Sequence, residues 1–165
     1  MFLGSVNGRA LRQRVFHQHQ NRKDIFLGKA YGEYYAKAFH DSKFCLVIRG
    51  LVTSTLRISE AFKYGCIPVI IIDGYVPPFS NTIDWSKFSI IIPENQTQQI
   101  PKILEGISET RWNAMNKNLL DVRHHFLYNE IPAVGDAFHM ILYEVWLKTK
   151  KFRFLQSLQE KSFFV

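Results

Sequence analysis

The sequence predicts an α/β fold with an open, mostly parallel, Rossmann-like sheet. Apolar runs at residues 44–48 and 67–72 have the length of buried strands, and a helical pattern lies between them. The order strand, loop, helix, strand is the unit from which parallel sheets are built. Strands and helices alternate to about residue 106, and helices complete the chain, which is typical of this fold class.

The elements before this central unit follow the same alternation. Residues 2–4 have the pattern of the end of a strand whose beginning is missing, and residues 24–28 predict a second short strand. Residues 9–18 and 31–40 carry apolar side chains at helical spacing and predict two helices.

The second half is predicted to be mainly helical. A strand is expected at 88–92, followed by helices at 98–106, 109–128 and 136–150. We therefore expect one domain over residues 1–165, with a helical carboxyl-terminal part from about residue 98.

Composition is that of a folded globular protein. The chain has 165 residues, of which 47% are apolar and 21% are charged. No stretch approaches the roughly 18 consecutive apolar residues of a membrane span. The apolar stretch at the start of the sequence is too short for a signal peptide, so the sequence shows no membrane anchor and no targeting signal.

The net charge of +7 raises the possibility of nucleic-acid binding. The charge is dispersed except near the two ends, and neither basic end is interleaved with aromatic residues as a base-stacking platform would be. A smaller anion, such as the diphosphate of a nucleotide sugar, is therefore favoured over DNA or RNA.

The two cysteines, Cys45 and Cys66, lie beside or within the apolar strands. They are too few for a disulfide framework, and no Cys–His spacing indicates zinc. The sequence favours two buried free thiols and leaves a single bridge open.

Polar residues gather where the first central strand ends. Arg49 and Gly50 follow the apolar run directly, and a residue without Cβ allows a phosphate to approach the backbone closely. Thr53 and Ser54 are both suited to cap the next helix. The start of that helix also offers unpaired N–H groups to an anion, at the edge where parallel sheets bind ligands.

Arg57 and Glu60 are neighbours on one face of this helix. They suit an exposed ion pair worth only about 0.2–0.5 kcal/mol. They equally suit a ligand site, in which Arg57 neutralises a phosphate and Glu60 accepts hydrogen bonds from ribose hydroxyls. Their position at the ligand edge of the sheet favours the second interpretation.

Two weaker signals accompany this site. Gly4, Gly8 and Arg9 belong to a loop between a strand and a helix, but its spacing does not fit Gly-x-Gly-x-x-Gly. Asp73 ends a strand and either contacts a sugar or caps the next element. No Asp-x-Asp pair, P-loop or Gly-x-Ser-x-Gly motif is present, which disfavours a metal–diphosphate bridge and a hydrolase.

These motifs resemble the signature of the exostosin-like glycosyltransferases. The resemblance rests on a central block and continues over nearly the whole chain, including the loop at Gly4 and the helix that begins at Arg9. The sequence departs from the family at Ile48, usually Pro, and at residues 51–52, usually more polar. The central block comprises Phe44–Gly50, Ser54-x-x-Arg57-x-x-Glu60-Ala61 and residues 65–69. The match continues over residues 34–44, residues 73–75, Pro78-Phe79 and residues 83–85.

The resemblance implies the carboxyl-terminal, donor-binding domain of a two-domain (GT-B type) enzyme. Such enzymes transfer a sugar from a UDP-sugar to a polysaccharide or glycan acceptor, as Golgi type II membrane proteins, without an obligatory metal cofactor. By this resemblance Arg49, Ser54, Arg57 and Glu60 would hold the diphosphate and ribose. The catalytic base would lie on an amino-terminal acceptor domain that is absent from this sequence, so no base is assigned.

Two other functions stay open. A module that has lost the acceptor half can act without catalysis, through a glycosyltransferase partner subunit. A basic nucleic-acid-binding domain is the third hypothesis, although no nucleic acid is expected as a partner.

Overall fold

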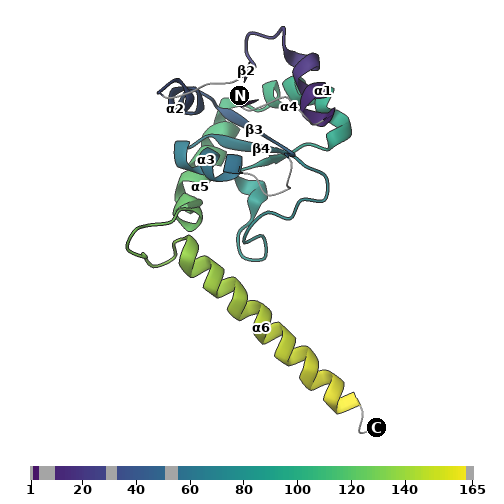
Figure 1. Cartoon of the computed structure of the whole chain (residues 1–165), viewed down its shortest axis with the longest axis vertical. Helices are drawn as coiled ribbons and strands as arrows, with labels where there is room; N and C mark the ends of the chain where they lie inside the picture. The colour runs from purple at the N-terminus through teal and green to yellow at the C-terminus, as the bar shows by residue number, and fades with distance from the viewer. Residues whose placement is uncertain (1, 4–9, 29–32, 51–55, 163–165) are drawn as a thin grey trace.

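The structure is a computed structural model that describes residues 2–3, 10–28, 33–50 and 56–162 (Figure 1). Its elements alternate between strand and helix in the first half and are helical in the second. In chain order they are β1 (Phe2–Leu3), α1 (Ala10–His19), β2 (Leu27–Gly28), α2 (Glu33–His40), β3 (Phe44–Ile48), α3 (Leu56–Tyr64), β4 (Ile67–Ile71), η1 (Trp85–Lys87), β5 (Ile90–Ile91), η2 (Glu94–Gln99), α4 (Ile100–Glu105), α5 (Glu109–Val122), η3 (Arg123–Phe126) and α6 (Ala137–Ser162).

All described strand pairs are parallel, as the sequence predicts. β3, β4 and β5 form one sheet in that order, with Phe44 opposite Ile67 and Ile48 opposite Ile71. β1 pairs with β2 in a second ladder and also lies against β3. Pro68 stands second in β4, at the beginning of the strand, where its missing N–H removes a single ladder bond.

Helices cover both faces of the three-stranded sheet. α1 and α4 pack on one face, and α3 and α5 pack on the other (Figure 1). Neighbouring residues of β3 point to opposite faces, so Leu46 joins the first cluster and Val47 the second. Burial on both faces explains why the central strands are continuous apolar runs. The predicted α/β class and the parallel sheet are confirmed.

An aromatic cluster fixes α3 against η1 and η3. Phe62 is fully buried, and its ring stacks on Phe126 with centroids 4.1 Å apart and an interplanar angle of 8°. Trp85 and Phe88 meet Phe62 edge-on. Trp85 Nε1 also donates a hydrogen bond to the Pro78 carbonyl at 2.9 Å. Stacked and edge-on rings of this kind stabilise a core beyond the area that they bury.

Several predicted element boundaries are wrong. The strands expected at 24–28 and 88–92 are only two residues long. Residues 24 and 25 are bends, and the N–H groups of Phe88 and Ser89 donate back to the Trp85 carbonyl. The helix expected at 109–128 changes to a 3-10 turn at Arg123. The helix expected at 136–150 continues to Ser162, because residues 151–162 contain no glycine or proline to end it.

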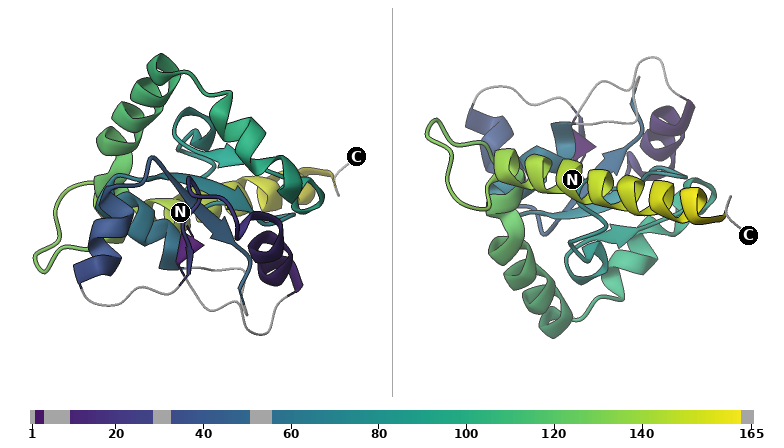
Figure 2. Two further views of the ribbon diagram at one scale, coloured as in Figure 1. Left: turned by 90° about the horizontal axis from the view of Figure 1, so that it is seen from above. Right: turned by 90° about the horizontal axis from the view of Figure 1, so that it is seen from below.

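α6 extends away from the rest of the fold (Figure 1), and in the view from below no other described helix covers it (Figure 2). Its amino end is fixed by Asp136, whose carboxylate accepts hydrogen bonds from the backbone N–H groups of Ala133 and His139. Further along the helix, large apolar side chains are exposed to solvent. They include Phe138, Ile141, Leu142, Val145, Trp146, Phe152 and Phe154.

Candidate functional site

Arg49 lies at the carboxyl end of β3, the position that the sequence predicts. Its Nη2 is 2.8 Å from Glu94 Oε1 and donates a hydrogen bond to the Asp73 carbonyl at 3.0 Å. The side chain of Arg49 is 38% exposed. Its Nε is buried and has no hydrogen-bond partner among the described residues. The Arg49 guanidinium is therefore held in position by its partners, while part of the side chain remains exposed to solvent.

Asp73 and Glu94 fix the position of this guanidinium. The Glu94 N–H donates to Asp73 Oδ1 at 3.0 Å, and the Asp73 N–H donates to Glu94 Oε1 at 3.1 Å. This reciprocal pair joins Asp73, the second residue after β4, to the start of η2. The next helical element along the chain, η1, is capped by Asp84 rather than by Asp73, and contact of Asp73 with a sugar stays a prediction.

Arg12 is a residue of this edge that the sequence did not identify. From α1, its Nε donates to the Arg49 carbonyl at 3.0 Å and its Nη2 to the Ile48 carbonyl at 3.3 Å. These carbonyls end β3 immediately before Gly50. His19, also on α1, is buried with its Nε2 2.8 Å from the carbonyl of Thr97, so α1 is held against η2 as well.

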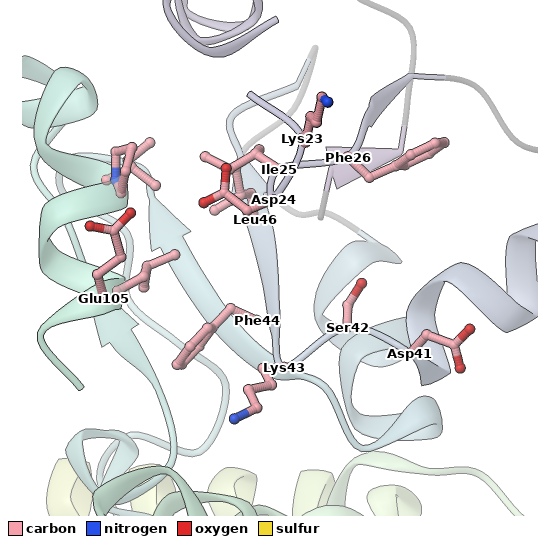
Figure 3. Close-up of a pocket in the computed structure, with 13 residues that line it drawn as sticks. Lys23, Asp24, Ile25, Phe26, Asp41, Ser42, Lys43, Phe44, Leu46 and Glu105 are labelled. Atoms are coloured by element: carbon pink, nitrogen blue, oxygen red, sulfur yellow. The ribbon is translucent and has the colours of Figure 1, made fainter. Parts of the chain in front are cut away.

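A cavity of about 400 Å³ opens at the opposite end of β3 (Figure 3). Its lining includes Lys43 and Phe44, which precede and begin the strand, together with residues of the loop before β2 and of α4, whereas Arg49 follows the strand. Ligands of open parallel sheets bind at the carboxyl edge. The cavity therefore lies apart from Arg12 and Arg49, which are at the other end of β3.

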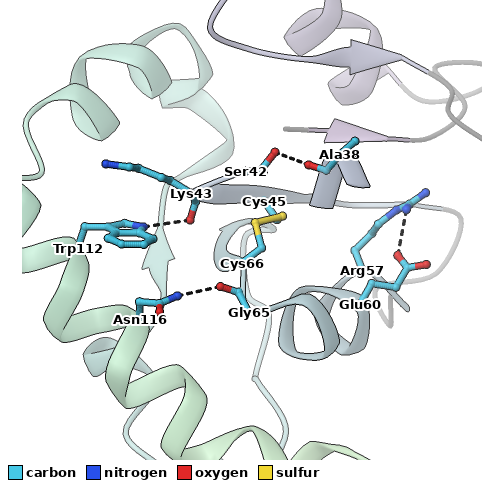
Figure 4. Close-up of a disulfide and its surroundings, with 10 residues drawn as sticks. All are labelled: Ala38, Ser42, Lys43, Cys45, Arg57, Glu60, Gly65, Cys66, Trp112 and Asn116. Carbon is cyan, nitrogen blue, oxygen red and sulfur yellow. Dashed lines mark hydrogen bonds and ion pairs between the residues drawn. A yellow bond between two sulfur atoms is a disulfide. The ribbon is translucent and has the colours of Figure 1, made fainter. Parts of the chain in front are cut away.

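Arg57 and Glu60 form the predicted ion pair on α3, with Arg57 Nη1 2.9 Å from Glu60 Oε2 (Figure 4). Their side chains are 21% and 27% exposed, so the pair is partly buried rather than fully solvated. Tyr35, on α2, joins it. The Tyr35 hydroxyl donates to Glu60 Oε1 at 2.6 Å and accepts a hydrogen bond from Arg57 Nη1.

Burial, together with the hydrogen bond to Glu60, raises the pKa of Tyr35 to about 12. The phenol therefore stays protonated at neutral pH and remains a donor to the carboxylate. The Arg57 guanidinium also lies 5.6 Å from the centre of the Tyr35 ring, within cation–π range. Tyr35 holds both charged groups, and no sequence motif identifies it.

The predicted site residues thus fall into three groups. Arg49 and Gly50 lie at the carboxyl end of β3, and Arg57 and Glu60 lie on the first turns of α3. The remaining three lie outside the described residues: they are Gly4, Arg9 and Ser54.

A disulfide joins Cys45 to Cys66, with their Cα atoms 5.8 Å apart (Figure 4). The expectation of two free thiols is wrong. Parallel pairing of Cys45 with Pro68 places the residue before β4 beside the start of β3, a relation that strand patterns do not show without the register. The bridge is buried among α2 and α3 side chains, which include Phe39 and Ala61.

The described residues contain neither a cluster of metal-ligating side chains nor a helix that could span a membrane. No group of three or more histidine, cysteine or acidic side chains converges there as metal ligands would. None of the helices in that part of the chain is long and apolar enough to cross a membrane.

Fold and site together define an α/β domain with guanidinium groups at the carboxyl edge of a parallel sheet, an arrangement suited to an anionic ligand. The pattern of the Exostosin GT47 domain matches residues 2–107. The chain therefore belongs to the exostosin family of glycosyltransferases.

Proteins similar to this chain are named as glycosyltransferases or exostosins. A probable glycosyltransferase of Arabidopsis thaliana is 36% identical over 149 residues, which are 89% of this chain and 29% of that protein. A probable glucuronoxylan glucuronosyltransferase of the same plant is 29% identical, covering 88% of this chain and 31% of that protein. The Exostosin-1 homolog of Caenorhabditis elegans is 32% identical, covering 67% and 28%. This chain thus spans about a third of each relative.

Proposed function

We propose that this chain is the donor-binding half of an exostosin-like glycosyltransferase of the GT-B type, with a Rossmann-like domain. It binds a UDP-sugar, and the complete enzyme transfers the sugar to a polysaccharide or glycan acceptor. The observation that carries the proposal is Arg49, held at the carboxyl end of β3 by Glu94 and the Asp73 carbonyl. The family match supports the reaction class.

In this proposal the arginines bind the diphosphate. An arginine fork donates two parallel hydrogen bonds to a phosphate, and each charge-assisted bond is stronger than a neutral one. Arg57 stands on the first turn of α3, where the helix dipole adds positive potential. Negative charge develops on the diphosphate as the sugar leaves, so fixed cations stabilise the transition state more than the bound donor. No obligatory metal is required.

Glu60 is proposed to bind the ribose. Its two oxygens already accept from Tyr35 and Arg57, and a carboxylate has about four acceptor positions. Hydroxyl groups of a ribose can therefore add to the existing bonds without displacing them. Tyr35 and Arg57 hold the carboxylate in one orientation for this purpose.

The base that deprotonates the acceptor is proposed to lie on an acceptor domain or a partner subunit. The relatives are about three times as long as the matched segment, so the family supplies more chain than these residues. A non-catalytic module that acts through a glycosyltransferase subunit is the second candidate, and the exposed apolar side chains of α6 favour it.

The proposed location is the Golgi. The buried disulfide supports an oxidising compartment, because such bonds persist along the secretory route and are rare in the cytosol. Asn95, within the acceptor triplet Asn-Gln-Thr, is exposed at the surface. The chain would be expressed through the secretory pathway and then treated with an enzyme that removes N-linked glycans. A decrease in mass would support this location, and an unmodified Asn95 would count against it.

Calorimetric titration with UDP tests the proposal. Arg57→Ala and Glu60→Ala are each expected to weaken binding at least tenfold, because each removes a charged partner of the ligand. Arg153→Ala is the matched control for Arg57→Ala, since it removes an equal charge from an exposed position on α6. Absence of UDP binding, or equal affinity in all four chains, would refute the donor site. Salt-dependent binding of RNA in its place would favour the nucleic-acid hypothesis.

A further inference from the structure

The Arg12 side chain bridges two successive carbonyl groups at the end of β3. Its Nε donates to the Arg49 carbonyl at 3.0 Å and its Nη2 to the Ile48 carbonyl at 3.3 Å. In an extended strand, successive carbonyl groups point to opposite sides of the backbone. One guanidinium can therefore reach both only where the chain turns, and β3 does end at Ile48. Arg12 thus holds the turn at which the strand passes into the following loop.

This turn also decides where the Arg49 side chain points. Arg49 Nη2 lies 2.8 Å from Glu94 Oε1 and donates to the Asp73 carbonyl at 3.0 Å. Both partners belong to segments that follow the next strands of the sheet, so the guanidinium reaches them only while the Arg49 backbone keeps its position. Arg12 therefore holds the backbone of Arg49, and Glu94 and the Asp73 carbonyl hold its side chain.

The α1 helix is a fixed support for Arg12. Leu11 and Val15 are buried in the cluster on one face of the sheet. His19, near the other end of the helix, is buried with its Nε2 2.8 Å from the Thr97 carbonyl. Because α1 cannot move without exposing these side chains, the hydrogen bonds of Arg12 transmit the position of a packed helix to the end of β3.

We propose that Arg12 is a positioning residue of the donor site and that it acts on the diphosphate through Arg49. With the turn after β3 held, the Arg49 guanidinium is oriented before the diphosphate binds, which lowers the entropy cost of binding. The identity of the ligand rests on the proposed function. The link from Arg12 to Arg49 does not, because it follows from the hydrogen bonds of the ligand-free chain.

Arg12→Lys tests the positioning role, because lysine keeps the positive charge and lacks the planar fork that reaches both carbonyls. The substitution is expected to weaken UDP binding in calorimetric titration about threefold to tenfold. Arg14→Lys is the matched control, since Arg14 is exposed on the same helix and makes only a long hydrogen bond, 3.4 Å, to the Glu94 carbonyl. Its UDP affinity should equal that of the original chain. Equal affinity in the Arg12→Lys chain would overturn the proposal.

A double-mutant cycle distinguishes positioning from direct contact. Arg49→Ala should weaken UDP binding at least about tenfold, because it removes the group that Arg12 positions. In the Arg49→Ala chain, Arg12→Lys should then change the affinity less than about twofold. Effects of the two substitutions that simply add would show that Arg12 acts on the ligand without Arg49, and would overturn the proposal.

Amide hydrogen exchange gives a readout that needs no ligand. The Asp73 N–H donates to Glu94 Oε1, the oxygen that also holds Arg49, and the Glu94 N–H donates to Asp73 Oδ1. Arg12→Lys should therefore speed exchange at the Asp73 and Glu94 amides about threefold or more, and leave the buried β4 amides of Val69 and Ile70 unchanged.

The two proposals fail separately. Absence of UDP binding by the original chain would refute the donor site, and the exchange rates would still decide the role of Arg12. Unchanged exchange at the Asp73 and Glu94 amides would show that Arg12 does not position Arg49. Faster exchange that extends equally to Val69 and Ile70 would show a general structural role. Either result would overturn the inference.

Discussion

Reduction of the Cys45–Cys66 disulfide is expected to destabilise this domain strongly. The two cysteines are 21 residues apart in sequence, so the bridge closes one loop that contains the α3 helix. The entropy lost by the unfolded chain on closing a loop of this length corresponds to about 3 kcal/mol at 25 °C. For a domain of this size, that loss lowers Tm by about 6–12 °C.

Urea unfolding with and without reductant measures the effect. The original chain should unfold at a lower urea concentration once reductant is present and the samples have equilibrated. The double variant Cys45→Ala and Cys66→Ala is the control, because it contains no disulfide for the reductant to break. Its unfolding midpoint should therefore be the same in both conditions.

Two outcomes would refute this reasoning. Alkylation of both cysteines in the native, unreduced protein would show that the bridge is absent. A midpoint that reductant leaves unchanged, in protein whose thiols are shown to be reduced, would show that the closed loop does not stabilise the fold. In the first case the support that the disulfide gives to a Golgi location would also disappear.

Three further results are expected. The His139 side chain and backbone N–H groups hold the pKa of Asp136 well below its usual range. The ionised Asp136 carboxylate therefore stabilises the folded state at pH values above that range, and this stabilisation is lost as pH falls below about 4. Asp136→Asn should flatten the decline of Tm between about pH 5 and pH 2, and an unchanged slope would contradict this. Phe62→Ala should cost about 3–5 kcal/mol in urea unfolding, because it empties the centre of the aromatic cluster, and a loss below about 1 kcal/mol would show that the cluster can collapse. Tyr35→Phe should weaken UDP binding about threefold to tenfold through Arg57, and unchanged affinity would rule out a positioning role.

The sequence predicted the central unit well. Residues 44–48 form β3 as expected, and Arg49 ends it, because a short run of β-branched and apolar residues between polar turns has few alternatives to a buried strand. The Arg57–Glu60 pair followed from helical spacing alone. Element ends were predicted less well. α6 extends well beyond the predicted end because no breaker residue marks its limit.

The partners of the site residues could not be predicted. Tyr35 contacts Glu60 across 25 positions of sequence, through the packing of α2 on α3. Glu94 meets Arg49 across a longer separation, because parallel pairing brings the carboxyl ends of β3, β4 and β5 to one edge. Neither pair has a local spacing that a motif could express.

The sequence by itself thus determined the class of fold, the direction of the strands and the arginines at the carboxyl edge of the sheet. These features depend on periodicity and on the chemistry of neighbouring residues, which a linear sequence shows directly. Tertiary structure alone decided the Cys45–Cys66 bridge, the contacts of Tyr35, the anchoring of Arg49 and the cavity at the amino end of β3. These depend on register and helix packing, and they form only when residues distant in sequence become neighbours in space.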